Sequence, residues 1–300
     1  MPRSSRPHSH PPSPPRIRRG NKQGTEQLRA LTIVLATLLL AIAGTAVPGP
    51  VRAQELAIPA PATIPNFAGL AVGFAPDYIG ANEYIVGPAP FARLGWSEWR
   101  SVTLVGNQLY ANMVNHPILR AGPLGRLRFG RSDVEDNVVK KMEDISATVE
   151  LGGYVGAEFI NETDPRIRLI TNISVTHDVG QVNNGLVVQG SINYWYPLAE
   201  FLTLGLATSV SYANGDWMET YFGVDNENSQ RSGLPVYRAG GGIKDVWVGP
   251  YFLFHLSREW HVTTGVFYSR LLSDAADSPV VKDRGSANQF IGGAGFLYSW

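Results

Sequence analysis

The sequence predicts an exported all-β protein that crosses a bacterial outer membrane as an antiparallel β-barrel. Two observations predict it: a leader-like N-terminus, and a series of later segments in which apolar residues alternate with small polar ones. Alternation with a period of two over roughly ten residues is typical of strands whose two faces meet different surroundings. A secreted β-sandwich has the same period, but its outward faces carry more Lys and Glu than these polar faces do.

The first 53 residues have the features of a secretory signal peptide. Residues 1–29 are polar and basic, and an uncharged run from Ala30 to Val51 follows. The run ends in Val51-Arg52-Ala53, which places small residues at the minus-three and minus-one positions, so we expect cleavage after Ala53. A membrane anchor is the alternative, because the run is about long enough to span a bilayer. Glycines and prolines between 44 and 50 interrupt it where an anchor would continue as helix.

The composition of the mature chain excludes several function classes. Residues 54–300 carry 17 Lys and Arg against 24 Asp and Glu, a net charge of −7, which disfavours a nucleic-acid partner. The absence of cysteine excludes disulfides, a thiol nucleophile, a cysteine zinc site and a lipidated N-terminus. No second apolar run of about 18 residues follows Ala53, which excludes a helical membrane protein. We expect no cofactor.

The mature chain divides into a short periplasmic segment at 54–66 and the barrel at 67–300. The clearest alternation runs from Leu202 to Tyr212, where the even positions are mostly large and apolar and the odd ones small or polar. Aromatic residues near strand ends suit the interfacial girdles of a membrane barrel. The last strand places Phe296, Tyr298 and Trp300 on one face, an aromatic ending that we interpret as the signal for the barrel-assembly machinery.

The lengths of the connections predict about ten strands, because such barrels have short periplasmic turns and longer outward loops. The expected strands lie near 67–74, 88–96, 117–130, 148–158, 166–177, 185–196, 202–212, 244–256, 260–271 and 288–300. Residues 101–116 and 236–243 are the weak points, and making both into strands gives an alternative count of twelve. That count places a long connection after Ala213 on the periplasmic side, which disfavours it.

A barrel of about this size has a narrow interior that its own side chains fill. Charged residues on the predicted inward faces could pair across it; these are Arg126, Arg128, Glu150, Glu158 and Arg168. We favour a structural plug, since buried charges need partners. A path for charged solutes is the alternative interpretation.

Five short blocks resemble the MipA/OmpV family of outer-membrane proteins, named for the MltA-interacting protein. They occur in the family's order across residues 67–300, although the family pattern leads us to expect Phe where the chain has Trp300. The blocks are Pro76-Asp77-Tyr78-Ile79-Gly80, Gly122-Pro123 with Gly130-Arg131, Tyr221-Phe222-Gly223-Val224, Ser232-Gly233-Leu234 with Tyr237, and Asp277-Ser278-Pro279-Val280-Val281.

The resemblance implies an outer-membrane location in a Gram-negative bacterium and a scaffold that docks a murein hydrolase and a murein synthase, with membrane lipid around the barrel. Other family members are linked to adhesion, osmotic response or solute uptake, so a narrow porin-like channel is the alternative function. Most block residues fall in predicted outward connections. There Pro, Gly, Asp and Ser are also what tight turns require, so turn chemistry competes with a ligand site.

Catalytic chemistry is weakly represented. His255 and Ser257 have the spacing His-x-Ser, which raises an outer-membrane lipid hydrolase as a minor alternative. We expect a structural role for both, because nucleophilic catalysis also needs an oriented base and an oxyanion site that the sequence does not supply. No metal site is expected, since His8 and His10 lie in the leader.

The signal-peptide assignment predicts that the protein recovered from outer membranes begins at Gln54. Intact-mass measurement of the purified protein, expressed with its own leader, should give the mass of residues 54–300. An Ala53→Leu variant should accumulate with the leader attached, because the processing site accepts only small residues at this position. Recovery of the uncleaved chain from wild-type cells would show that the segment is a membrane anchor.

Overall fold

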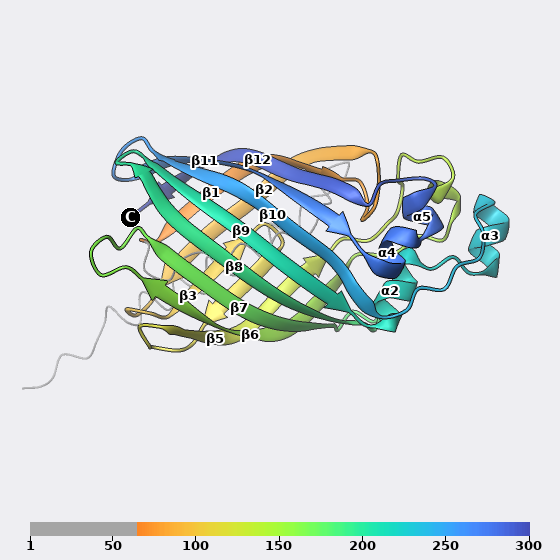
Figure 1. Ribbon diagram of the computed structural model, residues 1–300, viewed down its shortest axis with the longest axis horizontal. Helices are drawn as coiled ribbons and strands as arrows, with labels where there is room; N and C mark the ends of the chain where they lie inside the picture. The colour runs from red at the N-terminus through yellow and green to blue at the C-terminus, as the bar shows by residue number, and fades with distance from the viewer. Residues whose placement is uncertain (1–64) are drawn as a thin grey trace, which may run out of the picture. The chain divides into compact units, whose positions relative to one another are not determined.

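Residues 65–300 are described by a computed structural model, and they form a closed barrel of twelve antiparallel strands (Figure 1). The strands are β1 (Phe67–Pro76), β2 (Tyr84–Gly95), β3 (Ser101–Val105), β4 (Gln108–Asn112), β5 (Leu119–Arg128), β6 (Thr148–Ile160), β7 (Arg168–Asp178), β8 (Leu186–Ala199), β9 (Leu202–Ala213), β10 (Gly242–His255), β11 (Trp260–Leu271) and β12 (Asn288–Ser299). The signal peptide, its cleavage site at Ala53 and residues 54–64 lie outside this range.

Every strand pairs with its neighbours in the chain, and β1 closes the barrel by pairing with β12. The closing pair runs in register from Phe67 opposite Ser299 to Phe74 opposite Gly292. Closure matters because an unpaired sheet edge cannot survive in hydrocarbon, where no water satisfies the backbone N–H and C=O groups.

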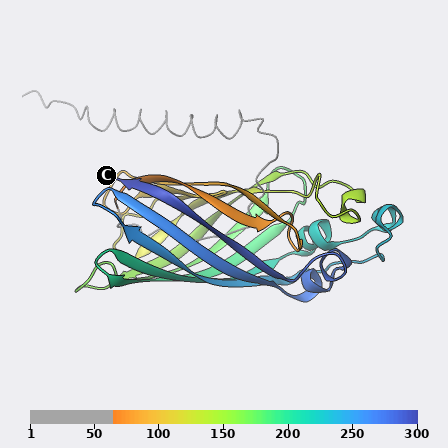
Figure 2. The ribbon, with the colours of Figure 1, turned by 90° about the horizontal axis from the view of Figure 1, so that it is seen from above.

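The two ends of the barrel differ. At the turn end, short connections join the strands at 96–100, 113–118, 161–167, 200–201 and 256–259. At the loop end, connections of seven residues or more at 77–83, 129–147, 179–185, 214–241 and 272–287 carry all the helices of residues 65–300. These are η1 (Val139–Lys141), α2 (Gly215–Phe222), α3 (Asn226–Ser232), α4 (Ser273–Asp277) and α5 (Pro279–Lys282). Figures 1 and 2 show α2 to α5 gathered at this one end.

The preference for ten strands is wrong, and the alternative count of twelve holds. Both additional strands, β3 and β4, lie within 101–112 and are only five residues long. They form a hairpin whose turn is permitted by Gly106, with φ of 56°. A hairpin starts and finishes at the same end of the barrel. Inserting one therefore leaves every later connection on the side where it would be without the hairpin. Loop lengths therefore could not reveal it. Residues 236–241 lie in a loop.

Side chains alternate between lipid and lumen along every long strand. Leu70, Val72, Val155 and Ile173 are between 57% and 59% exposed although they are large and apolar, and they lie on the outer surface. Their neighbours of opposite parity point inward. The last strand follows the same rule, with Phe296, Tyr298 and Trp300 exposed on the outer surface.

The loops at the loop end pack into a hydrophobic cap. Trp217, Met218 and Phe222 of α2 have no exposed surface, and they contact residues from four other connections, including Val281 of α5. The side chain of Asn214 accepts a hydrogen bond from Trp217 N at 3.3 Å and so begins α2. Among residues 65–300, no helix is both long enough and apolar enough to cross a membrane.

The outward orientation of β7 gives a direct test. Replacing Ile173, at the middle of the strand, by Arg should destabilise the barrel by about 2–4 kcal/mol, because the charge would lie in the bilayer midplane. Reversible denaturant unfolding in lipid vesicles measures this, with Ile173→Leu as the matched control. Equal stability of the two variants would mean that position 173 does not face hydrocarbon.

Candidate functional site

The first cluster in the lumen is centred on Glu150 of β6 and lies beneath the cap. The Glu150 carboxylate accepts hydrogen bonds from Arg128 Nε at 2.9 Å, from Thr176 Oγ1 at 3.1 Å and from Trp217 Nε1 at 3.2 Å. Arg126 Nη1 lies 3.5 Å from the same carboxylate. Because Trp217 belongs to α2, this carboxylate joins the barrel wall to the cap.

The second cluster lies nearer the turn end and is centred on Glu158, eight residues further along β6. The Glu158 carboxylate is 2.9 Å from Arg120 Nη2 and 3.6 Å from Arg168 Nη1. Arg120 also stacks over the ring of Trp99, at 5.1 Å from the ring centroid. These contacts tie β5, β6 and β7 together across the inner face of the wall.

All five predicted lumen charges therefore point inward, and each has an opposite charge beside it. Four further buried residues that the sequence did not single out complete the clusters, namely Arg93, Arg120, Lys244 and Trp217. Arg120 shares the parity of Arg126 and Arg128, so its orientation could have been predicted. Trp217 lies on a loop helix, and no strand periodicity could place it in the barrel.

The first family block stabilises the cap. Asp77 accepts a hydrogen bond from Glu135 N at 3.0 Å, which links the first loop to the 129–147 loop. Tyr78 is buried in a cluster with Val139 and Val280, and Pro76 is buried at the end of β1. Gly80 has φ of 97°, a conformation that side chains disfavour, and a Cβ there would lie 2.5 Å from Val281.

The remaining predicted block residues meet at the same place. Ser278 Oγ donates to Phe222 O at 2.6 Å, and Arg131 Nη1 donates to Tyr221 O at 3.3 Å. Gly223 ends α2, Pro279 is buried at the start of α5, and Asp277 is exposed. In the structure these residues take part in loop packing and turns, which was the alternative to a ligand site.

Burial and hydrogen bonding shift the pKa values of several groups in the cap. Burial lowers the pKa of Arg131 to about 10 and raises the pKa of Tyr221 to about 12. Burial of the Asp136 carboxyl acts to raise its pKa, but hydrogen bonds from Arg284 and from two backbone N–H groups outweigh it and hold the pKa below its usual range. The Asp136–Arg284 pair, at 2.6 Å, joins the 129–147 and 272–287 loops.

The candidate catalytic pair is not assembled. His255 Nδ1 lies 2.9 Å from His261 Nδ1, and its Nε2 lies 3.1 Å from Thr203 Oγ1. Ser257 Oγ instead accepts from Glu259 N and Trp260 N and so shapes the turn that connects β10 to β11. Within residues 65–300, no group of three or more His, Asp or Glu side chains could hold a metal ion.

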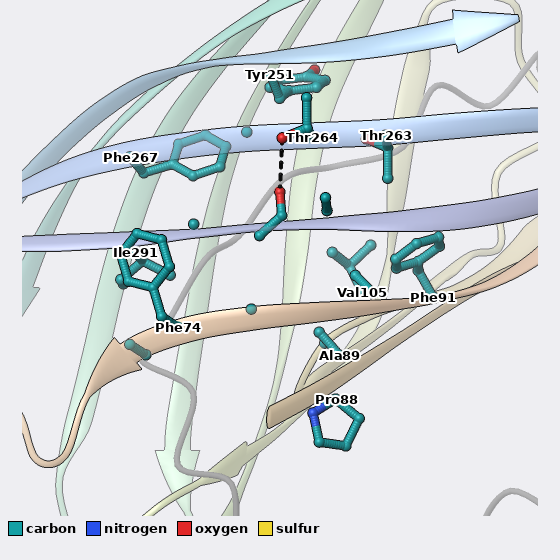
Figure 3. A pocket seen from close by; sticks show the side chains of 18 of the residues that line it. Phe74, Pro88, Ala89, Phe91, Val105, Tyr251, Thr263, Thr264, Phe267 and Ile291 are labelled. Carbon is teal, nitrogen blue, oxygen red and sulfur yellow. Dashed lines mark hydrogen bonds between the residues drawn. The ribbon is translucent and has the colours of Figure 1, made fainter. Parts of the chain in front are cut away.

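Opposite the charge clusters, the lumen contains an apolar cavity of about 250 Å³. It is lined by β1, β2, the β3–β4 turn, β8, β10, β11 and β12. Figure 3 shows Ala89, Phe91 and Val105 on one side of it, with Tyr251, Phe267 and Ile291 across from them. No Asp, Glu, Lys, Arg or His is among its lining residues. Small residues such as Gly73, Ala71 and Ala89 leave the space that larger inward side chains would fill.

The sequence is similar to two curated outer-membrane proteins of Vibrio. It is 30% identical over 167 residues to outer membrane protein OmpV of Vibrio cholerae, and 28% identical over 163 residues to outer membrane protein Omp26La of Vibrio anguillarum. Each match covers 54% of this chain and 58% of the relative, so the chain spans little more than half the length of either one.

Two solved structures resemble the fold at low identity. The NanC porin aligns with a TM-score of 0.47 at 10% identity, covering 78% of this chain and all of that one. OmpT of Vibrio cholerae aligns with a TM-score of 0.36 at 8% identity, covering 78% and 96%. The profile described as MltA-interacting protein MipA matches residues 68–300, nearly the whole barrel. The chain therefore belongs to the MipA family, and it is a β-barrel of the Gram-negative outer membrane.

Proposed function

We propose that this protein is a closed barrel that serves as a scaffold and docks peptidoglycan-remodelling enzymes on its periplasmic side. The observation that carries the proposal is the burial of the charged lumen residues. Arg126, Glu150 and Glu158 are at most 2% exposed, and polar partners surround them.

Buried charges argue for a plug because an aqueous channel leaves its lining charges accessible to water. Taking a carboxylate out of water costs several kcal/mol unless opposite charges and hydrogen bonds replace the lost hydration. Glu150 has that replacement in two arginines, a threonine and Trp217. The cap adds a second barrier, since Trp217 and Phe222 have no exposed surface above the lumen.

A barrel that conducts nothing still presents two surfaces. The outer-membrane setting directs the turn end to the periplasm, where the connections expose polar groups such as Glu162 and the pair Asp164–Arg166. Membership of a family described as MltA-interacting protein supports a docking role, and the periplasmic direction of the turn end makes it the surface that enzymes of the periplasm could reach. We therefore propose the turn end as the docking surface for a murein hydrolase and a murein synthase.

If the charge clusters plug the lumen, loss of the Glu150 carboxylate should strongly destabilise the barrel. Replacing Glu150 by Ala should destabilise the barrel by about 3–5 kcal/mol, because Arg126 and Arg128 would remain buried beside each other without their carboxylate. Denaturant unfolding in lipid vesicles measures the loss. The matched control is Glu162→Ala on an exposed turn, for which we expect a change within about 0.5 kcal/mol. A small effect at Glu150 would mean that water reaches the cluster.

The scaffold role predicts specific capture without conductance. The purified protein should give no steady current in a planar bilayer. When immobilised in lipid nanodiscs, it should retain a murein hydrolase and a murein synthase from envelope extract, identified by mass spectrometry. Reversing Glu162 and Asp164 to Lys should weaken the capture, because both carboxylates lie on the proposed surface.

The control for that experiment is Glu227→Lys with Asp225→Lys, a reversal of equal size on the loop end. It should leave capture of the two enzymes unchanged. Steady ion conductance would favour the narrow channel instead. Failure to retain either enzyme, with the barrel shown to be folded, would refute the scaffold role.

A further inference from the structure

The apolar cavity plays no part in the proposed scaffold function. Its volume exceeds the 150 Å³ of an engineered protein cavity that binds benzene, and scaling from that case gives room for roughly ten non-hydrogen atoms. The charge clusters occupy the opposite side of the lumen, on β5 to β7, so a space of this size is a specific local feature. It is shaped by small residues on β1 and β2 and by aromatic residues on β10 and β11.

The lining excludes charged occupants. No ionisable Asp, Glu, Lys, Arg or His side chain borders the cavity, and a charge placed there would have no counter-ion. Ordered water is also a poor occupant, because a buried water needs two to four polar partners and most of these walls are hydrocarbon. Thr264, one of the few polar lining residues, already donates its hydroxyl to Gly293 O at 3.1 Å (Figure 3). An uncharged, mostly hydrocarbon molecule fits these walls.

The aromatic part of the wall presents ring surfaces to the cavity. Tyr251 is 6% exposed, and its ring meets that of Trp195 edge to face at 4.9 Å. Both residues line the cavity, but the Tyr251 hydroxyl and Trp195 Nε1 are fully buried behind these rings. The rings therefore add apolar surface to the wall and offer no hydrogen-bond donor to an occupant.

The cavity lies beside a short gap in the strand pairing. The β3–β4 hairpin pairs with β2 only from Phe91 to Gly95, so residues 84–89, in the loop-end half of β2, have no strand paired on that side. The hairpin turn, Gly106 and Asn107, lines the cavity. A longer hairpin would place side chains in this space, so the shortness of β3 and β4 helps to leave the cavity open.

We propose that the cavity binds one uncharged, mostly hydrocarbon molecule of roughly ten non-hydrogen atoms. This site is separate from the turn-end surface of the scaffold proposal, so either one can fail without the other.

The test uses 2-nonanone, a methyl ketone of suitable size, with the purified protein in lipid nanodiscs. Equilibrium dialysis of the labelled ketone, with empty nanodiscs subtracted, should show saturable binding of about one molecule per barrel. Nonanoate, which carries a charge, should not compete. Absence of saturable binding in the wild-type protein would overturn the proposal.

Two variants locate the binding. Ala89→Phe should abolish saturable binding because the ring would occupy the cavity, whereas the matched control Ala92→Phe, on the outer face of the same strand, should bind normally. Ala71→Leu, a smaller enlargement on the inner face of β1, should weaken 2-nonanone binding without abolishing it, because the added carbons take up part of the cavity.

The Ala71→Leu variant keeps the proposal testable if the bulkier Ala89→Phe chain does not fold. Circular dichroism and the heat-dependent shift in gel mobility establish folding of each variant. Normal binding by folded Ala89→Phe or by folded Ala71→Leu would overturn the location.

Discussion

Backbone hydrogen bonding in hydrocarbon is the constraint on which this structure depends. A chain in the bilayer core can satisfy its N–H and C=O groups only within itself, and a sheet does so only when its first and last strands meet. Here β1 and β12 meet over eight residue pairs, from Phe67–Ser299 to Phe74–Gly292. Closure then fixes two environments for every strand, so residues of one parity face lipid and those of the other face the lumen.

The lumen is asymmetric because the inward-facing side chains differ between the two sides of the barrel. On β5, β6 and β7 the inward positions carry arginines and glutamates, which are stable there only as paired clusters. On β1, β2 and β12 the inward positions include glycine and alanine, which cannot fill the space, and the aromatic rings of Tyr251 and Phe267 complete the wall. One side of the interior is therefore filled by paired charged side chains, and the other side contains a cavity.

The long strands could be predicted from the sequence, but the contacts between residues on distant strands could not. The alternation from Leu202 to Tyr212 is confirmed by β9, since it reports only on local exposure. The strands β3 and β4 are too short to show alternation, and their hairpin leaves the order of loops unchanged. The cavity was not predictable, because Ala89 and Phe267 are brought together only by the register of three strand pairings around the closure. Likewise, nothing in the helix sequence of α2 indicates that Trp217 reaches Glu150.

The cap shows why closure of the loop end does not depend on any single loop. Ser278 binds Phe222 O, Asp77 binds Glu135 N, and Asp136 pairs with Arg284, so each link joins loops from different strand pairs. Beneath this cap, Glu150 binds Trp217 and two arginines of the wall, which couples the cap to the barrel. The polar half of the lumen and the loop end are thus joined by hydrogen bonds and ion pairs. None of these named contacts comes from a turn-end connection, so the docking surface proposed for that end can change without breaking them.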